Sequence, residues 1–524
     1  FRHGKFRGGL IYQPENRRIM PNGLLARRTI GYITEDTLAN IVGIEGSFNS
    51  YLAGKDGLKV QQRLTGGAWI DVDNLETVHA RPGYNIVTTI DLDLQDATEN
   101  ALYKQLVKHR AHHGCAVVME VKTGDIKAIA NLEIGSDGRY HETYNYAVGE
   151  STEPGSTFKL MSMIAALEDG VIDLHDTINT GDGTVKYYDK VIRDHEEKGL
   201  GKITAREVFE HSSNVGTAKI VYESYKDNPR RYVDRLYSMQ INKPLGLQIK
   251  GEGKPVIRAP GDKLWSGISL PMMSHGYEVQ MTPLQILTFY NAVANDGKMV
   301  KPRFVTEVRD GNRLVKSFGT EVITNAICSR STIRKAQSLL EGVVENGTAK
   351  NLKNSNYRIA GKTGTAQIAN AKHGYRSGAR ISYQASFVGY FPADDPLYSC
   401  IVVVNAPSNW VYYGNVVSGP VFKEVADKVY AGNFYRDLQA LNPEGEDKIT
   451  LREATHEVET KDLTLSGGVM PDVVGMGLKD ALFMLENSGL RVSYTGRGKV
   501  ARQSPRPGVK ISRGATVAIE LRMK

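Results

Sequence analysis

The chain has 524 residues, which suggests about three or four domains at roughly 100–200 residues each. Hydrophobic residues make up 41% and charged residues 24%, an ordinary globular composition with enough apolar material for a large core. The formal net charge is +8 without any long run of Lys or Arg, so a nucleic-acid-binding tail is not expected. No apolar run reaches about 18 residues, and the three cysteines form no paired pattern, so neither a membrane-spanning helix nor a disulfide scaffold is predicted.

Changes in composition predict four regions. Residues 1–85 mix short apolar stretches with glycine and charge, and residues 86–440 contain all the candidate catalytic residues. Residues 441–466 are polar and fairly acidic without periodicity, which is typical of a linker, and residues 467–524 form a small terminal unit. Because the chain begins with Phe1 rather than methionine, a preceding segment with a signal or membrane anchor is expected outside it.

The predicted elements of the large region alternate between helices and strands. A strand over 84–90 precedes a helix that begins near Asp91 or Asp93, and two apolar runs around 122–125 predict a β-hairpin. The later elements are helices over 205–295, three strands of an antiparallel meander within 358–404, a helix over 421–430 and, in the terminal unit, a helix over 478–487. This order predicts an α+β fold with an antiparallel sheet flanked by helices.

The first candidate site is the pair Ser156 and Lys159. Pro154-Gly155 interrupts the chain just before Ser156, and the apolar run over 157–167 predicts a buried helix. Ser156 then lies at the helix N-terminus, where free N–H groups favour negative charge, and Lys159 projects from the same face. Burial lowers the pKa of a lysine, so the two residues form a candidate nucleophile and base. Taken alone, the pattern is more often a capping serine with a solvent-seeking lysine.

The second candidate site is the triplet Ser212-Ser213-Asn214 between two helical stretches. Ser212 is suited to relay a proton to a leaving group, and the Asn214 amide is suited to hold a substrate amide. The alternative interpretation is another helix cap. The adjacent His211 is expected to be structural.

The third candidate site is Lys362-Thr363-Gly364-Thr365, at the start of the strand block. The glycines of this strand would allow a ligand close to the backbone. Lys362 and the threonine hydroxyls would bind a terminal carboxylate, and the N–H of Thr365 would donate to an oxyanion. The string resembles part of a Walker loop, but the full spacing needs a glycine where the chain has Asn356, so nucleotide binding is not predicted.

The motifs S-x-x-K, S-x-N and K-T-G, in this order, are the signature set of penicillin-recognising serine enzymes. The chain resembles a class B penicillin-binding protein, a D,D-transpeptidase of peptidoglycan, over nearly its whole length. RRIMPNGLLARRTIGYI and GIEGSFNSYLAGKDG resemble two N-terminal family segments, although Met20 replaces a common tyrosine. Residues 467–524 resemble a single PASTA domain of α/β type, which points to the division-associated branch. The resemblance implies a penicillin-binding/β-lactamase-like core with an N-terminal pedestal over residues 1–85.

The resemblance also implies a role for each motif residue. Ser156 attacks the D-Ala-D-Ala carbonyl of a stem peptide after Lys159 takes its proton, and the N–H groups of Ser156 and Thr365 hold the oxyanion. Ser212 helps to protonate the leaving amine, and Asn214 orients the substrate amide. The catalytic set is therefore Ser156, Lys159, Ser212, Asn214 and Lys362, and the carboxylate of the substrate is bound by Lys362, Thr363 and Thr365 beside Gly364. Neither a metal nor a cofactor is implied.

The implied partners are peptidoglycan stem peptides, β-lactams as covalent inhibitors, and a glycosyltransferase with other division proteins. The family implies an inner-membrane anchor and a periplasmic catalytic domain, and region 1–85 is expected to contact the glycosyltransferase. A β-lactamase shares the motifs, but neither Glu223 nor Glu252, the glutamates between Asn214 and His275, begins an E-x-x-x-N string. A non-enzymatic β-lactam sensor and a D,D-carboxypeptidase remain alternatives, and the PASTA unit either binds cell wall or packs on the core.

Overall fold

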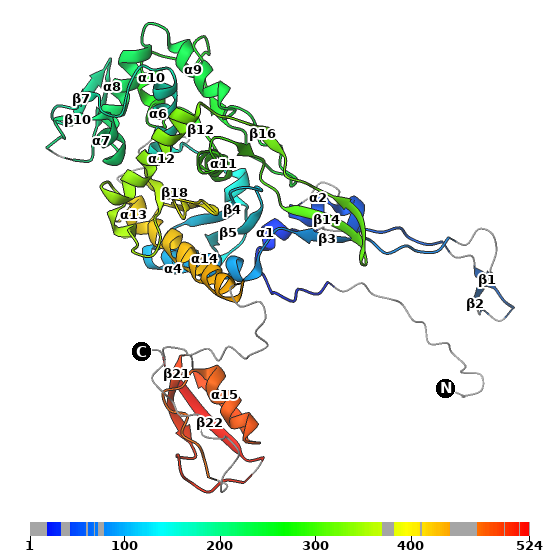
Figure 1. Cartoon of the computed structure of the whole chain (residues 1–524). Coiled ribbons are helices and arrows are strands. Elements are labelled where there is room, and N and C mark those ends of the chain that lie inside the picture. The colour runs from blue at the N-terminus through cyan, green and yellow to red at the C-terminus, as the bar shows by residue number, and fades with distance from the viewer. Residues whose placement is uncertain are drawn as a thin grey trace. The chain divides into compact units, whose positions relative to one another are not determined.

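The chain forms two compact units, Phe1–Leu441 and Asn442–Lys524, which Figure 1 shows in colours that follow the sequence. The computed structural model describes residues 18–32, 42–58, 61–65, 67, 69–71, 78–196, 198–368, 382–408, 411–440, 469–496, 498–512 and 514–522. The predicted linker, 441–466, lies outside the described residues. Within those ranges, no helix combines the length and the hydropathy required to cross a bilayer.

The first unit is built on a six-stranded antiparallel sheet with the order β17-β18-β19-β4-β5-β6. The strands are β4 (His113–Glu120), β5 (Ile126–Ile134), β6 (Tyr140–His141), β17 (Ala360–Gln367), β18 (Tyr383–Phe391) and β19 (Tyr398–Asn405). The predicted hairpin and meander are therefore confirmed. Their junction pairs β19 with β4, so that Val404 lies opposite Gly114 although nearly 300 residues separate them. Short-range patterns carry no information about such a pairing.

Helices cover both faces of this sheet. Phe387 and Phe391 of β18 point to one face, where each meets Phe422 of α14 (Gly419–Ala440) edge to face. The long helix α4 (Leu92–His109) begins at the N-cap Asp91, whose side chain accepts from the N–H of Leu94, in agreement with the predicted start. The predicted helix over 421–430 is correct in type, but α14 extends it at both ends.

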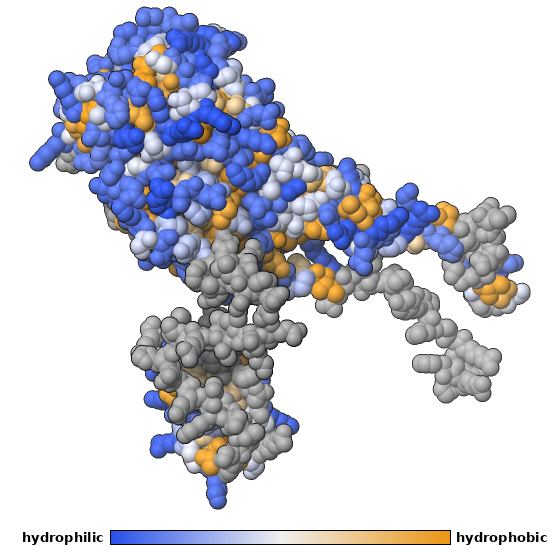
Figure 2. Space-filling view, in the orientation of Figure 1, coloured by the Kyte–Doolittle hydropathy of each residue, from blue (hydrophilic) through white to orange (hydrophobic). Residues whose placement is uncertain are grey.

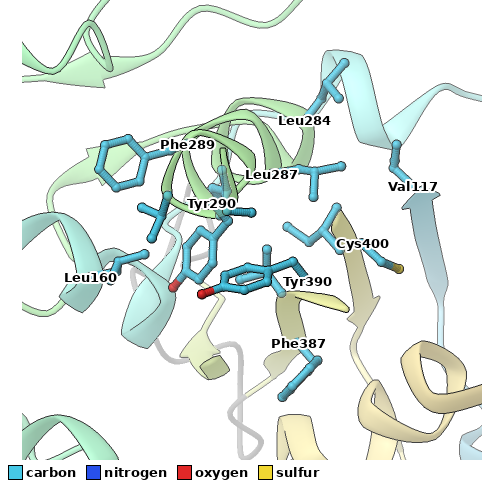
Figure 3. Close-up of a cluster of buried hydrophobic side chains, with 14 of the residues drawn as sticks. Val117, Leu160, Leu284, Leu287, Phe289, Tyr290, Phe387, Tyr390 and Cys400 are labelled. Carbon is cyan, nitrogen blue, oxygen red and sulfur yellow. The ribbon is translucent and has the colours of Figure 1, made fainter. Parts of the chain in front are cut away.

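Helix α11 (Pro283–Ala294) is buried at every residue and provides much of the core. In Figure 3, Leu287 and Tyr290 of α11 lie beside Tyr390 of β18, with Cys400 of β19 close by. Cys400 is buried, as is Cys115 of β4, so both cysteines belong to the core. The Tyr290 hydroxyl donates to the Thr157 carbonyl at 2.8 Å, which ties the core helix to the turn that carries Ser156.

A helical layer lies beyond the edge strand β17. It comprises α6 (Lys159–Glu168), α7 (Ala205–Glu210), α8 (Asn214–Tyr225), α9 (Pro229–Ser238), α10 (Ser269–Met273) and α12 (Arg330–Glu345). Two small antiparallel pairs, β7 (Thr177–Asn179) with β10 (Lys202–Thr204) and β8 (Thr184–Tyr187) with β9 (Lys190–Arg193), interrupt the layer and have no predicted counterpart. The candidate site residues lie between β17 and this layer.

The N-terminal part shares the core of the first unit. Its elements are α1 (Arg27–Ile30), α2 (Gly43–Ser47), α3 (Asn49–Leu52), β1 (Gln61–Arg63) and β2 (Trp69–Asp71). Ile44 and Phe48 pack into the main hydrophobic cluster, and the Arg28 N–H donates to Glu142 at 2.8 Å. The predicted strand over 84–90 is shorter, β3 (Asn85–Thr88), and it joins β14 (Val305–Asp310) and β15 (Arg313–Ser317) in a three-stranded sheet.

The second unit has one helix and a three-stranded sheet. Helix α15 (Leu478–Asn487) has the predicted bounds. Strand β22 (Thr516–Arg522) lies between β20 (Arg491–Gly496), to which it is parallel, and β21 (Lys499–Ser504), to which it is antiparallel. Its apolar core consists of Met470, Val473, Ala481, Leu485, Leu490, Val500, Val517, Ile519 and Leu521.

Candidate active site

Ser156 lies in a 3₁₀ turn, Gly155–Phe158, that leads directly into α6. The prediction placed Ser156 at the start of a continuous α-helix, but the first turn is tighter, and residues three apart stack in a 3₁₀ turn. Gly155 has φ +56, and a Cβ there would come within 2.8 Å of Ala366 on β17, so only glycine allows the turn to approach the strand. The Ser156 side chain is therefore positioned against the edge of the sheet.

Lys159 is completely buried, and its ammonium group points toward the second motif. Its Nζ donates to the Ser212 carbonyl at 2.5 Å, to Ser212 Oγ at 3.2 Å and to Asn214 Oδ1 at 2.7 Å. The solvent-seeking interpretation of Lys159 is therefore wrong. The hydrogen bonds join the first and second motifs, which are 53 residues apart in sequence.

Burial lowers the pKa of Lys159 to about 7, although the Asp194 carboxylate acts in the opposite direction. Near neutral pH, a large fraction of Lys159 is then unprotonated and able to accept a proton. Burial and the neighbouring Lys159 also hold the pKa of Lys362 well below its ordinary value. Two lysines in one buried cluster favour a state in which at least one of them is neutral.

The three residues of the second motif differ in their conformations and hydrogen bonds. Ser213 is the N-cap of α8, and its Oγ accepts from the Gly216 N–H at 2.8 Å. The helix-cap interpretation therefore applies to Ser213 alone. Ser212 has φ +57, a left-handed conformation that is rare outside glycine, and it directs its hydroxyl to the two lysines. Asn214 accepts from Lys159 and donates through Nδ2 to the Arg193 carbonyl at 2.8 Å.

The third motif occupies β17. The completely buried Lys362 donates through Nζ to Ser212 Oγ at 2.8 Å and to the Thr363 carbonyl at 3.1 Å. The Thr363 hydroxyl bonds to Thr348 Oγ1 at 2.7 Å. A Cβ on Gly364 would lie 2.2 Å from Ser386 Oγ, so this glycine allows β17 to pack within the protein rather than leaving space for a ligand.

Two cavities, each of about 330 Å³, meet at Ser156. Both are also lined by Asp194, His195 and Thr365. The first extends past β9 and is lined further by Lys190, Arg193, Asn214, His275, Tyr277, Gln367, Tyr383 and Tyr412. The second is lined further by Glu196, His211, Ser212, Thr348, Thr363, Tyr413 and Asn415. Lys362 lines neither cavity, so it acts on bound molecules only through its neighbours.

The residues after β9 were missed by the sequence interpretation. Asp194 accepts from Ser213 Oγ at 2.8 Å and from the Val215 N–H at 2.9 Å, and it lines both cavities. His211, expected to be structural, lines the second cavity. The string RDHEEKG around Asp194 has no short motif, so its place beside Ser156 follows only from the fold. The structure shows no cluster of three or more metal-ligating side chains among its described residues.

A buried serine–lysine–serine–lysine array at the edge of an antiparallel sheet defines a penicillin-recognising serine acyltransferase. Comparison with known protein families supports the same class of enzyme. The chain matches the penicillin binding protein transpeptidase domain over residues 114–427 and the PASTA domain over residues 468–522.

Individual relatives agree as well. The chain is 30% identical over 411 residues to the penicillin-binding protein PbpB of Mycobacterium tuberculosis, which covers 75% of this chain and 58% of that protein. It is 28% identical over 423 residues to the peptidoglycan D,D-transpeptidase FtsI of Escherichia coli K12, which covers 79% of this chain and 67% of that protein. The crystal structure of penicillin binding protein 3 from Mycobacterium tuberculosis aligns with a TM-score of 0.65 and 27% identity over 80% of this chain and 91% of that one.

The chain belongs to the penicillin-binding protein transpeptidase family, as a class B member with a C-terminal PASTA domain. The predicted family and fold class are thereby confirmed. Solved complexes of the Mycobacterium tuberculosis relative contain aztreonam and ampicillin. As a member of this family, the chain is a serine acyltransferase that binds β-lactams.

Proposed function

We propose that this enzyme cross-links peptidoglycan stem peptides through an acyl-enzyme on Ser156. The observation that carries the proposal is the buried hydrogen-bonded array Lys159–Ser212–Lys362 at the point where two cavities meet beside Ser156. A neutral amine, a relay hydroxyl and two adjoining spaces are the parts that acyl transfer from one peptide to another requires.

In the first half of the proposed reaction, Lys159 takes the proton of Ser156 as its Oγ bonds to the carbonyl carbon of the penultimate D-Ala. The N–H groups of Ser156 and Thr365 are proposed to hold the resulting oxyanion. The carbon–nitrogen bond then breaks, and the terminal D-Ala leaves with a proton that Ser212 delivers and Lys159 returns. Because Ser212 Oγ accepts N–H bonds from both lysines, its own proton is left to point elsewhere.

In the second half, an amine of a neighbouring stem peptide loses a proton to the same relay and bonds to the acyl carbon, and Ser156 leaves with a proton. The incoming amine takes the position of the departing one, so the second cavity is proposed to hold first the leaving D-Ala and then the acceptor. Thr363 and Thr365 line this cavity and are proposed to bind the terminal carboxylate. Lys362 supports them from within the protein and does not touch the carboxylate.

The proposal is tested by intact-mass spectrometry of the parent and of Ser156→Ala after incubation with benzylpenicillin, followed by product analysis with a stem-peptide donor and an added amine acceptor. A persistent one-to-one adduct on the parent alone, together with a cross-linked product, supports transpeptidation. Cross-linking that continues in Ser156→Ala would overturn the assignment of the nucleophile. Rapid release of hydrolysed drug indicates a β-lactamase, hydrolysed peptide alone a carboxypeptidase, and acylation without peptide turnover a sensor.

A role in cell division at the outer face of the inner membrane is part of the same proposal. The E. coli relative FtsI and the other named transpeptidases motivate it. In the N-terminal part, large apolar side chains are exposed, including Leu58, Trp69, Ile70 and Val78. Exposed apolar side chains on one part of a chain favour a protein partner, which we propose to be a septal glycosyltransferase. Unchanged co-purification of Trp69→Ala/Ile70→Ser with that glycosyltransferase would remove this part of the proposal.

A further inference from the structure

A groove of about 880 Å³ lies over β7, β8 and the middle of α8. It shares no lining residue with the two cavities at Ser156. Its volume falls in the range of about 300–1,000 Å³ that is typical of ligand sites. The lining includes three tyrosines, Tyr187, Tyr188 and Tyr222, whereas the face of the molecule in Figure 2 is largely hydrophilic.

Three tyrosines line this groove: Tyr188 is exposed, Tyr222 is half-buried and Tyr187 is nearly buried. The rings of Tyr187 and Tyr222 lie 4.5 Å apart between centroids, and the side chains of Tyr222 and Tyr188 are joined by a hydrogen bond. Tyrosine offers an apolar face and a polar edge, so a lining of this kind suits a ligand whose flat faces are apolar and whose edges carry hydrogen-bonding groups.

The backbone conformation of Tyr188 is unfavourable for a residue other than glycine or asparagine. It is the first residue of the two-residue turn between β8 and β9, where φ is +53, and glycine or asparagine is the usual choice there. A bulky residue at positive φ is an outlier, and 65% of this side chain is exposed. Part of the Tyr188 ring packs over Gly267, where a Cβ would lie 2.5 Å from Cε2, and a binding role accounts for the surface that stays exposed.

The groove also offers charged groups of both signs, although the Glu223 carboxylate already accepts a hydrogen bond from Lys226. The Tyr187 hydroxyl is buried without a hydrogen-bond partner among the described residues, although its ring lines the groove and the residue is only 8% exposed. Lys219 uses one of its three N–H groups on the Asn179 carbonyl, and Glu223 lies on the same helix. Mixed charge argues against a polyanion and favours a neutral, hydroxyl-rich ligand.

A single β-hairpin, formed by β8 and β9, separates this groove from the first cavity at Ser156. Tyr187 and Val185 of β8 line the groove, whereas Lys190 and Ile192, their partners on β9, line the first cavity at Ser156. Paired strands lie about 4.8 Å apart, and one extended peptide residue spans about 3.3–3.6 Å. A few residues of a stem peptide are therefore enough to cross from one side of the hairpin to the other.

We propose that the groove binds the glycan strand of peptidoglycan, a chain of N-acetylated amino sugars, while the attached stem peptide reaches Ser156. The inference rests on the proposed function, because it names the carrier of the same substrate. The apolar C–H faces of pyranose rings pack on Tyr188 and Tyr222, and the hydroxyl and acetamido groups reach Lys219 and Glu223. A free peptide is the rival occupant, since the two-stranded sheet offers its backbone as a template.

The test is titration calorimetry of the full chain with the soluble β-1,4-linked tetramer of N-acetylglucosamine. Parent protein is compared with Tyr188→Ala, Tyr222→Ala and the control Tyr103→Ala, which removes a tyrosine 47% exposed on α4, away from the groove. Saturable binding is expected for parent and control, with affinity about tenfold weaker in each groove variant, as expected for loss of one aromatic contact. Benzylpenicillin acylation of Ser156 should be equal in all four proteins.

Equal affinity in all four proteins, or no binding by the parent, overturns the groove assignment. Displacement of the tetramer by a free stem peptide that itself loses affinity in Tyr188→Ala identifies a peptide groove and also overturns it. If the tetramer binds through the tyrosines while benzylpenicillin fails to acylate Ser156, the glycan site stands and the proposed reaction fails. The two hypotheses are thus separated in one set of proteins.

Discussion

The two compact units differ in what they bury. The catalytic unit contains Lys159 and Lys362 with no exposed surface, beside an extensive apolar core. In the described part of the PASTA unit, by contrast, the buried residues are nine apolar side chains and Ser488. Burying an ionisable amine is unfavourable unless its charge is lost or satisfied, so it persists where its chemistry is used. The catalytic unit therefore buries groups that its reaction needs, whereas the PASTA unit buries groups that only pack.

Removing one buried amine from the catalytic unit is expected to have the largest effect. Lys159→Met is expected to lower the rate of Ser156 acylation by benzylpenicillin about 10²–10⁴-fold, the usual range for loss of a general base. Lys159→Arg is the matched control, because a guanidinium stays protonated at all working pH values and cannot take the serine proton. Rapid-quench kinetics of both variants measures the effect. Recovery of the parent rate in Lys159→Arg would exclude the proton-transfer role.

Removal of a buried apolar side chain from the PASTA unit is expected to act on stability alone. Leu485→Ala should destabilise this unit by about 2–5 kcal/mol, because the side chain is completely buried. Calorimetry should show an earlier transition for the terminal unit and an unchanged transition for the catalytic unit, with a normal acylation rate. A slower acylation rate in Leu485→Ala would indicate that the two units are coupled, contrary to the comparison.

The pH dependence of acylation sharpens the description of the catalytic region. Burial lowers the pKa of Lys159 to about 7, and only the neutral amine accepts a proton. The acylation rate should therefore rise about tenfold per pH unit below about 7 and level off above it. Stopped-flow acylation between about pH 5 and 9 provides the measurement, with the unfolding temperature as a control for stability. A rate independent of pH across this range would place the base elsewhere.

The smallest expected effect concerns Ser213, the helix cap between the motif residues Ser212 and Asn214. Ser213→Ala should destabilise the catalytic unit by about 1 kcal/mol, since Ser213 caps α8, and should also slow acylation because it removes one of the two hydrogen bonds that Asp194 accepts. Ser329→Ala is the matched control, as Ser329 caps α12 and accepts from the Thr332 N–H at 3.3 Å. Thermal unfolding and acylation kinetics are compared. Equal acylation in both variants would show that Asp194 does not need the hydrogen bond from Ser213.

Local patterns predicted the main strands of the sheet and a helix of the second unit. The hairpin around 122–125, the meander within 358–404 and the helix over 478–487 follow from alternation, turn residues and helical spacing, which act over a few residues. The pairs β7–β10 and β8–β9 were missed because their strands have three or four residues and little alternation. The 3₁₀ geometry at Ser156 was missed because it arises from close packing of Gly155 on β17.

By itself, the sequence determined the three motifs, their order and the residue types that the chemistry requires, because these are properties of short strings. Only the tertiary structure decided that Ser212 is the point where both lysines meet, that Lys362 is sealed from the cavities, and that Asp194 lies beside Ser156. These features depend on the pairing of β19 with β4, two strands far apart in the chain, and on a left-handed residue at 212. Contacts of that kind are settled by global packing, which no short window of sequence contains.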